Sequence, residues 1–172
     1  MNPIYERDPE ELDNWVRSGH SMSNKDALEL ECLLKDDSYK ERLQLLGYYV
    51  AHTVSIDSRH RYHELIFWFI DRYPDLEFLR RGFFRVSRAP GSPYEQITDL
   101  WRNKVAEDPS NINVLLSAAY QANMSDISLA KEYADRVQQL APDLPSLKRL
   151  YSSIANHEEI VRQFTVMKFE EP

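Results

Sequence analysis

The sequence predicts an all-α protein built from stacked helical hairpins. The chain has only four glycines in 172 residues, so few tight turns with positive φ are available to join the strands of a β-sandwich. Apolar side chains recur at intervals of three and four residues through most of the chain, which is the periodicity of amphipathic helices. Pro74, Pro109 and Pro142 each follow such a segment, at spacings of 35 and 33 residues. These prolines divide the chain into pairs of helices.

The first 37 residues predict an acidic pair of helices. Asp8 can cap a helix, Pro9 suits its first position, and the acids that follow face the positive end of the helix dipole. Gly19 is expected to end this helix. A second helix is predicted over 23–37, and Cys32 lies in its apolar pattern, so its thiol is expected to be buried. The inner face of this second helix is expected to hold Ala27, Leu28, Leu30, Leu33 and Leu34.

Residues 38–172 predict the remaining helices of a single domain that spans 1–172. In the helix expected up to Pro74, apolar side chains form one stripe, which two further aromatic residues widen. The stripe consists of Tyr62, Leu65, Ile66, Phe69 and Ile70, and the flanking residues are Phe67 and Trp68. A shorter and less regular helix begins at Asp75 and breaks at Gly82. A C-terminal helix follows the last predicted helix. The other predicted ranges are 37–55, 57–74, 112–123, 126–140 and 144–155. A further helix is expected to open at Ser92-Pro93, with Ile97, Leu100, Trp101 and Val105 inside.

The segment SNINVLLSAAYQANMSDISLAKEYADRVQQLAPDLP, residues 110–145, resembles a degenerate tetratricopeptide repeat. Ala118 and Ala130 match small positions of the repeat, and Pro142 closes the unit. In residues 40–74, Leu46-Gly47 matches the Leu-Gly pair of the first helix, and a close helix contact would explain a glycine there. The resemblance implies helical hairpins stacked in a right-handed superhelix, with about eight or nine helices in the chain.

This resemblance also implies a groove that binds a partner protein or peptide. If Gly47 occupies the eighth position of a repeat, its helix presents four side chains on the concave side, and the later repeat adds Asn123. A tyrosine flanked by polar groups is typical of a binding surface. The expected groove residues are Glu41, Gln44, Tyr48, His52 and Asn123.

The charge of the chain limits the classes of molecule that it is expected to bind. Its net charge is −7, and residues 1–37 hold ten acids and four bases. Neither nucleic acid nor an anionic membrane is therefore expected as a partner, whereas a basic protein is one candidate. The longest apolar run, LIFWFI, is too short to span a bilayer, and the N-terminus lacks the pattern of a secretory signal. A cytoplasmic protein is expected, as a monomer or a weak homodimer.

The segment RRGFFRVSR, residues 80–88, concentrates positive charge beside two phenylalanines. Such a cluster could hold the acidic N-terminal segment of the same chain, bind an acidic protein, or clamp phosphates and stack on bases. An intramolecular or structural role is favoured over the other two. The residues of this basic cluster are Arg80, Arg81, Arg85 and Arg88.

Two histidines, His60 and His63, are neighbours on one helix face, and His52 lies on the preceding helix. Their spacing matches neither HExxH nor HxxEH. We therefore expect a polar helix edge and no metal site. The chain also lacks a nucleophile motif and a Gly-rich phosphate loop, so neither catalysis nor a cofactor is expected.

The sequence thus favours a non-catalytic interaction module. Two alternatives remain open. A small immunity or antitoxin-type inhibitor would use its acidity to meet a basic toxin. A metal-dependent hydrolase would use His52, His60 and His63.

Overall fold

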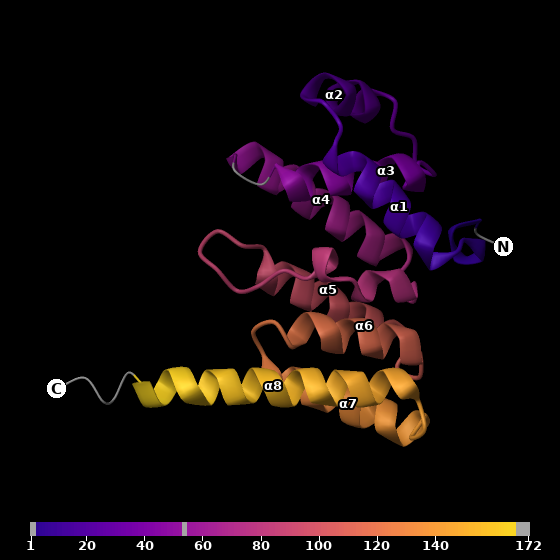
Figure 1. Cartoon of the computed structure of the whole chain (residues 1–172). Helices are drawn as coiled ribbons and strands as arrows, with labels where there is room; N and C mark the ends of the chain where they lie inside the picture. The colour runs from indigo at the N-terminus through magenta and orange to yellow at the C-terminus, as the bar shows by residue number, and fades with distance from the viewer. Residues whose placement is uncertain (1–2, 53–54, 168–172) are drawn as a thin grey trace. The chain divides into compact units, whose positions relative to one another are not determined.

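The computed structural model describes residues 3–52 and 55–167, and every regular element within these ranges is a helix (Figure 1). The all-α prediction is confirmed. Residues 53–54, where a helix was predicted to continue, and the last residues, 168–172, lie outside the described residues. The 3-10 helices are η1 (Pro3–Glu6), η2 (Glu77–Arg80) and η3 (Gly82–Phe84); the α-helices are α1 (Pro9–His20), α2 (Asn24–Cys32), α3 (Tyr39–Ala51), α4 (Ile56–Arg72), α5 (Tyr94–Glu107), α6 (Ile112–Ala122), α7 (Ile127–Leu140) and α8 (Pro145–Met167).

Contacts between residues divide the chain into two compact units, Met1–Arg72 and Tyr73–Pro172. Unit 1 contains α1 to α4, and unit 2 contains α5 to α8. The single domain and the right-handed superhelix stay predictions. No helix in the described part of the chain combines the length and the apolar character that crossing a membrane requires.

In unit 1, α1 begins as its sequence predicts. The carboxylate of Asp8 accepts a hydrogen bond of 2.8 Å from the backbone N–H of Glu10, and Pro9 is the first helical residue. The predicted end at Gly19 is wrong, because α1 continues to His20. Gly19 is buried inside the helix, where it serves packing rather than termination.

The contact between α1 and α3 brings two backbones together at glycines. A Cβ atom on Gly19 would lie 1.8 Å from the carbonyl oxygen of Gln44, and one on Gly47 would lie 1.9 Å from that of Val16. Any side chain at either position would collide with backbone, which cannot rotate away. The close helix contact predicted for Gly47 is confirmed, and the structure identifies α1 as the partner helix.

The second helix differs from its prediction. α2 ends at Cys32 rather than near residue 37. Leu33 is 69% exposed and Leu28 is 51% exposed, and the thiol of Cys32 is exposed as well. The predicted burial of these three residues is therefore wrong. Leu33 lies beyond the end of α2 and so is not on its inner face. The main contact of α2 is with α3, which leaves much of the surface of α2 exposed.

Unit 2 contains the helical hairpin predicted around residues 110–145. Asn111 caps α6 and Asp126 caps α7 through side-chain oxygens. Ala118 and Ala130 are both buried, as a close approach of these two helices requires. The prediction of separate helices after residue 144 is wrong, because α8 runs unbroken from Pro145 to Met167 (Figure 1).

Candidate functional site

Three helices of unit 1 surround an open pocket with a volume of about 450 Å³. Each of α2, α3 and α4 contributes to it, together with the start of the loop after α2. The pocket combines apolar and charged side chains. Its lining consists of Glu31, Cys32, Leu34, Arg42, Leu45, Arg61, Glu64, Leu65 and Trp68.

One side of the pocket is apolar. Leu45 of α3 and Leu65 of α4 belong to the buried core of unit 1 and form the pocket floor. Trp68, one turn after Leu65, is half-buried. The guanidinium carbon of Arg42 lies 4.1 Å from the Trp68 ring centroid, within the range of a cation–π contact. Arg42 also donates a hydrogen bond of 2.5 Å to the carbonyl of Lys35, so the stacked pair is held in place.

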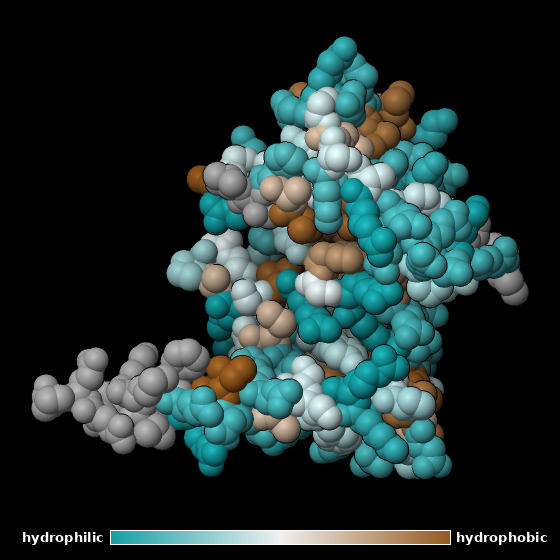
Figure 2. All heavy atoms as spheres, viewed as in Figure 1, coloured by the Kyte–Doolittle hydropathy of each residue, from teal (hydrophilic) through white to brown (hydrophobic). Residues whose placement is uncertain are grey.

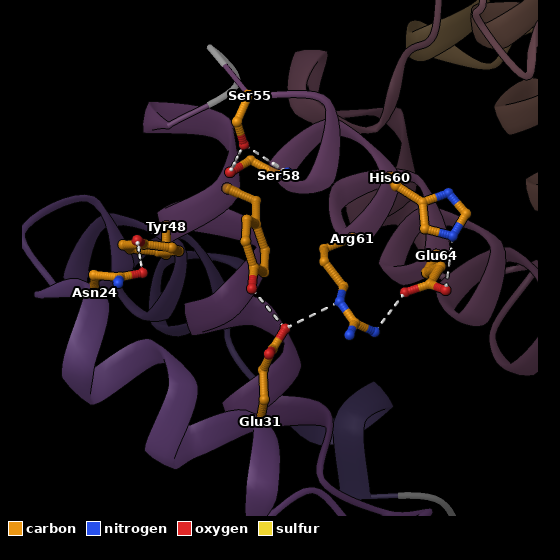
Figure 3. A network of polar contacts seen from close by, with 9 residues as sticks. Asn24, Glu31, Tyr48, Ser55, Ser58, His60, Arg61 and Glu64 are labelled. Carbon is orange, nitrogen blue, oxygen red and sulfur yellow. Dashed lines mark hydrogen bonds and ion pairs between the residues drawn. The ribbon is translucent and has the colours of Figure 1, made fainter.

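The other side of the pocket is a chain of polar contacts between three helices (Figure 3). Tyr49 donates a hydrogen bond of 2.5 Å to Glu31, and the Nε atom of Arg61 lies 3.8 Å from the same carboxylate. Arg61 also pairs with Glu64 at 3.1 Å, and His60 lies 3.2 Å from Glu64. Opposite charges therefore meet within the pocket wall.

Burial and these contacts shift two ionisation equilibria. Burial, followed by the hydrogen bond to Glu31, raises the pKa of Tyr49. The hydrogen bond to Glu64 and the nearby Glu31 carboxylate raise the pKa of Arg61. Tyr49 therefore remains a hydrogen-bond donor, and Arg61 remains charged, throughout the neutral pH range.

Three of the residues predicted to line a groove interact within unit 1. Gln44 donates a hydrogen bond of 3.2 Å to Ser18. Tyr48 is only 6% exposed, and its hydroxyl donates to Asn24 at 3.0 Å. His52 stacks on Tyr48 with ring centroids 4.3 Å apart. Tyr48 therefore offers little surface to a partner.

The other two predicted groove residues lie in different units. Glu41 is half-exposed near the start of α3. Asn123 is buried at the end of α6, where its amide donates a hydrogen bond of 3.0 Å to Ser153 of α8. The polar side chain of Asn123 thus links two helices of unit 2.

Two arginines of the basic cluster are largely enclosed in unit 2. The side chain of Arg80 is 11% exposed and donates a hydrogen bond of 2.5 Å to Asn113 of α6. Arg85 donates to the backbone carbonyl of Arg80 at 2.9 Å and lies over the ring of Tyr120. Burial lowers the pKa of both guanidinium groups. Both side chains thus contribute to packing within the unit.

The other two arginines of the cluster are exposed and point to separate neighbours. Arg81 lies 5.9 Å from the ring centroid of Phe78. Arg88 pairs with Glu95 at 2.9 Å and lies over Tyr94. Both arginines therefore have contacts with neighbours in unit 2.

The three histidines have different surroundings. His52 contacts the backbone of its own helix, and His60 faces Glu64. Burial, with smaller effects from His60 and Arg59, lowers the pKa of His63. Across residues 3–52 and 55–167, no three histidine, cysteine or carboxylate side chains gather in a group that could hold a metal ion.

The pocket was missed because its residues come from three helices with no common motif. Trp68 is predicted only as a broad flank of an apolar stripe, and Arg42 has no distinctive neighbours in the sequence. One feature of the sequence could have pointed to the pocket: Cys32, Leu33 and Leu34 precede a run of charged residues. Their apolar pattern was instead taken to predict a buried helix face.

Comparison of the chain with models of known families, with curated proteins and with solved structures gives no match. The function is therefore inferred from the pocket and from the charges of the chain.

Proposed function

We propose that the protein is a non-catalytic interaction module that binds a partner protein or peptide at the pocket of unit 1. One observation carries this proposal: an open pocket joins a buried leucine floor to the half-buried Trp68 and its stacked Arg42. Tryptophan and arginine are the side chains most enriched at the energetic centres of protein interfaces. A partner side chain in this pocket would meet apolar surface and a polar rim together.

The surface beside the pocket supports a macromolecular partner. Leu28 and Leu33 are exposed on and just after α2, and Figure 2 shows apolar side chains at the surface in this part of unit 1, at the top of the view. Leu33 lies in the chain between two lining residues, Cys32 and Leu34, so exposed apolar surface adjoins the pocket and extends the area that a partner can bury. Arg61 and Glu64 neutralise each other within the wall, so the pocket favours an amphipathic segment over a strongly charged small molecule.

Cys32 allows a direct test of this proposal. It is the only cysteine of the chain, it is exposed, and it lines the pocket. Alkylation with a bulky maleimide should fill the pocket mouth and abolish capture of the partner from a native lysate. The measurement compares captured proteins, by mass spectrometry, before and after alkylation.

The matched control is Cys32→Ser treated with the same maleimide. This variant has no thiol to modify and should retain the partner. Capture that survives alkylation of the wild-type protein would show that the partner binds another surface. Loss of capture in the treated Cys32→Ser variant would show that the reagent acts elsewhere.

A second candidate function is inhibition of a basic toxin in the cytoplasm, and the charge of unit 1 favours it. Residues 1–72 hold fourteen acids and nine bases. Asp36 and Asp37 are exposed in the loop after α2. Charge of one sign increases the association rate with a partner of the opposite sign.

This candidate predicts a strong dependence on salt. Raising the ionic strength from about 0.01 M to 0.15 M shortens the screening length from about 30 Å to 8 Å, so the association rate should fall about tenfold or more. Stopped-flow or surface plasmon resonance measurements of the captured partner would report the rate. A Cys32→Ser control should show the same dependence, and a flat response would rule out charge-steered inhibition.

A further inference from the structure

Apolar packing holds α2 on unit 1 only weakly. Among the nine residues of α2, all of them described, Ala27 alone is fully buried. By contrast, α3 buries side chains along most of its length, including Leu43, Leu45 and Leu46. A helix with so few buried apolar contacts has a low free energy of local opening.

Polar contacts from α3 and α4 hold α2 at both of its ends instead. Asn24, its first residue, accepts the hydrogen bond from Tyr48 at 3.0 Å. Glu31, near its last residue, accepts the hydrogen bond from Tyr49 at 2.5 Å and lies 3.8 Å from Arg61. Figure 3 shows both ends of this arrangement, with Asn24 beside Tyr48 and Glu31 turned toward Arg61.

The same helix forms one wall of the pocket. Glu31 and Cys32 line it from α2, and Leu34 lines it from the following loop. The floor residues, Leu45 and Leu65, belong to α3 and α4. Movement of α2 away from α3 would therefore uncover the floor while leaving it in place.

We infer that α2 is a latch over the leucine floor of the open pocket of unit 1, held against α3 by the hydroxyl groups of Tyr48 and Tyr49. This inference concerns regulation of the pocket, so it rests on the proposed function. The hydrogen bond from Tyr48 has a neutral amide acceptor, and the one from Tyr49 has a carboxylate acceptor. Each contributes only modestly to stability, so the latch can open without unfolding the rest of the unit. The backbone contact at Gly19 and Gly47 joins α1 to α3 and does not involve α2.

The latch can be loosened by removing two oxygen atoms. The double variant Tyr48→Phe with Tyr49→Phe keeps both rings for packing. It also keeps the edge contact between them, in which the ring centroids lie 5.1 Å apart. The hydrogen bonds to Asn24 and Glu31 are lost. Tyr151→Phe is a matched control in unit 2, because the Tyr151 hydroxyl donates to the carboxylate of Asp135 at 2.6 Å and so has the same chemistry as Tyr49.

The first measurement is amide hydrogen exchange across the whole chain. The double variant should raise exchange in α2 at least about tenfold and leave α1 and α3 unchanged, whereas Tyr151→Phe should leave α2 unchanged. Equal acceleration in α1, α2 and α3 would overturn the inference, since it would indicate general destabilisation. Unchanged exchange in α2 would overturn it too.

The second measurement uses anilinonaphthalene sulfonate, a dye whose fluorescence rises on apolar surface. The double variant should bind more dye than the wild-type protein or Tyr151→Phe, because the leucine floor is uncovered. Faster exchange in α2 without extra dye binding would overturn the latch, as α2 would then move without uncovering the leucine floor. Neither measurement requires the partner, so failure of the latch is distinguishable from failure of the proposed function, which alkylation of Cys32 tests separately.

Discussion

Replacing Gly47 with alanine is expected to destabilise unit 1 by at least about 3 kcal/mol. In an exposed helix interior the same change would stabilise by roughly 1 kcal/mol, because alanine loses less backbone freedom on folding. At Gly47 the new Cβ would lie 1.9 Å from the carbonyl oxygen of Val16. Since that oxygen belongs to the backbone of α1, relief requires the two helices to separate. Urea unfolding followed by circular dichroism measures the loss.

Gly82→Ala provides the matched control. A Cβ atom at Gly82 would have no neighbour within 4 Å, so this variant should stay within about 0.5 kcal/mol of the wild-type protein. Gly19→Ala, on the other side of the same contact, should resemble Gly47→Ala. If Gly47→Ala unfolded at the wild-type urea concentration, α1 and α3 could not be packed backbone to backbone.

The sequence predicts a helix well where the spacing of apolar residues within that helix is sufficient to identify it. Four of the five residues of the stripe predicted in α4 are buried, and the first, Tyr62, is half-buried. The buried four are Leu65, Ile66, Phe69 and Ile70. The predicted role of Gly47 is also correct, because a glycine in a helix interior needs a compensating contact. The periodicity could not identify the helix that packs against Gly47. That helix is α1, which lies outside the predicted hairpin of residues 40–74.

The prediction is wrong for α2, where the apolar periodicity of the sequence was taken to mean that the apolar side chains are buried. Leu28 and Leu33 satisfy a helical stripe in the sequence yet are exposed. A stripe shows that a face can be buried, but whether it is depends on how many helices pack on it. For α2 that number is small, and the two tyrosine hydroxyls that hold this helix come from α3, a later segment.

The pocket escapes prediction for a related reason. Arg42 and Trp68 belong to different helices and meet only through the packing of α3 on α4. Conversely, Tyr48 was expected in a groove because the repeat resemblance placed it on the concave side of its helix. Its ring is instead buried, and its hydroxyl donates a hydrogen bond to Asn24. The direction of a side chain depends on tertiary contacts that local composition does not encode.

Replacing Gln121 with leucine is expected to destabilise unit 2 by about 3 kcal/mol. Gln121 is buried on α6. Its amide donates a hydrogen bond of 2.7 Å to the carbonyl of Val86, and its carbonyl accepts one of 3.0 Å from the N–H of the same residue. Leucine fills a similar volume but leaves two buried backbone groups without partners. Urea unfolding of the full chain measures the effect.

Gln139→Leu is the control, because Gln139 is exposed on α7 and its loss should change the unfolding free energy little. Gln121→Glu sharpens the test: the carboxylate can still accept from the Val86 N–H but cannot donate to the Val86 carbonyl. This variant should be destabilised as well, since a buried negative charge would face a carbonyl oxygen. Wild-type stability in both Gln121 variants would mean that water satisfies the Val86 backbone, and that the segment after η3 is not anchored to α6 by this side chain.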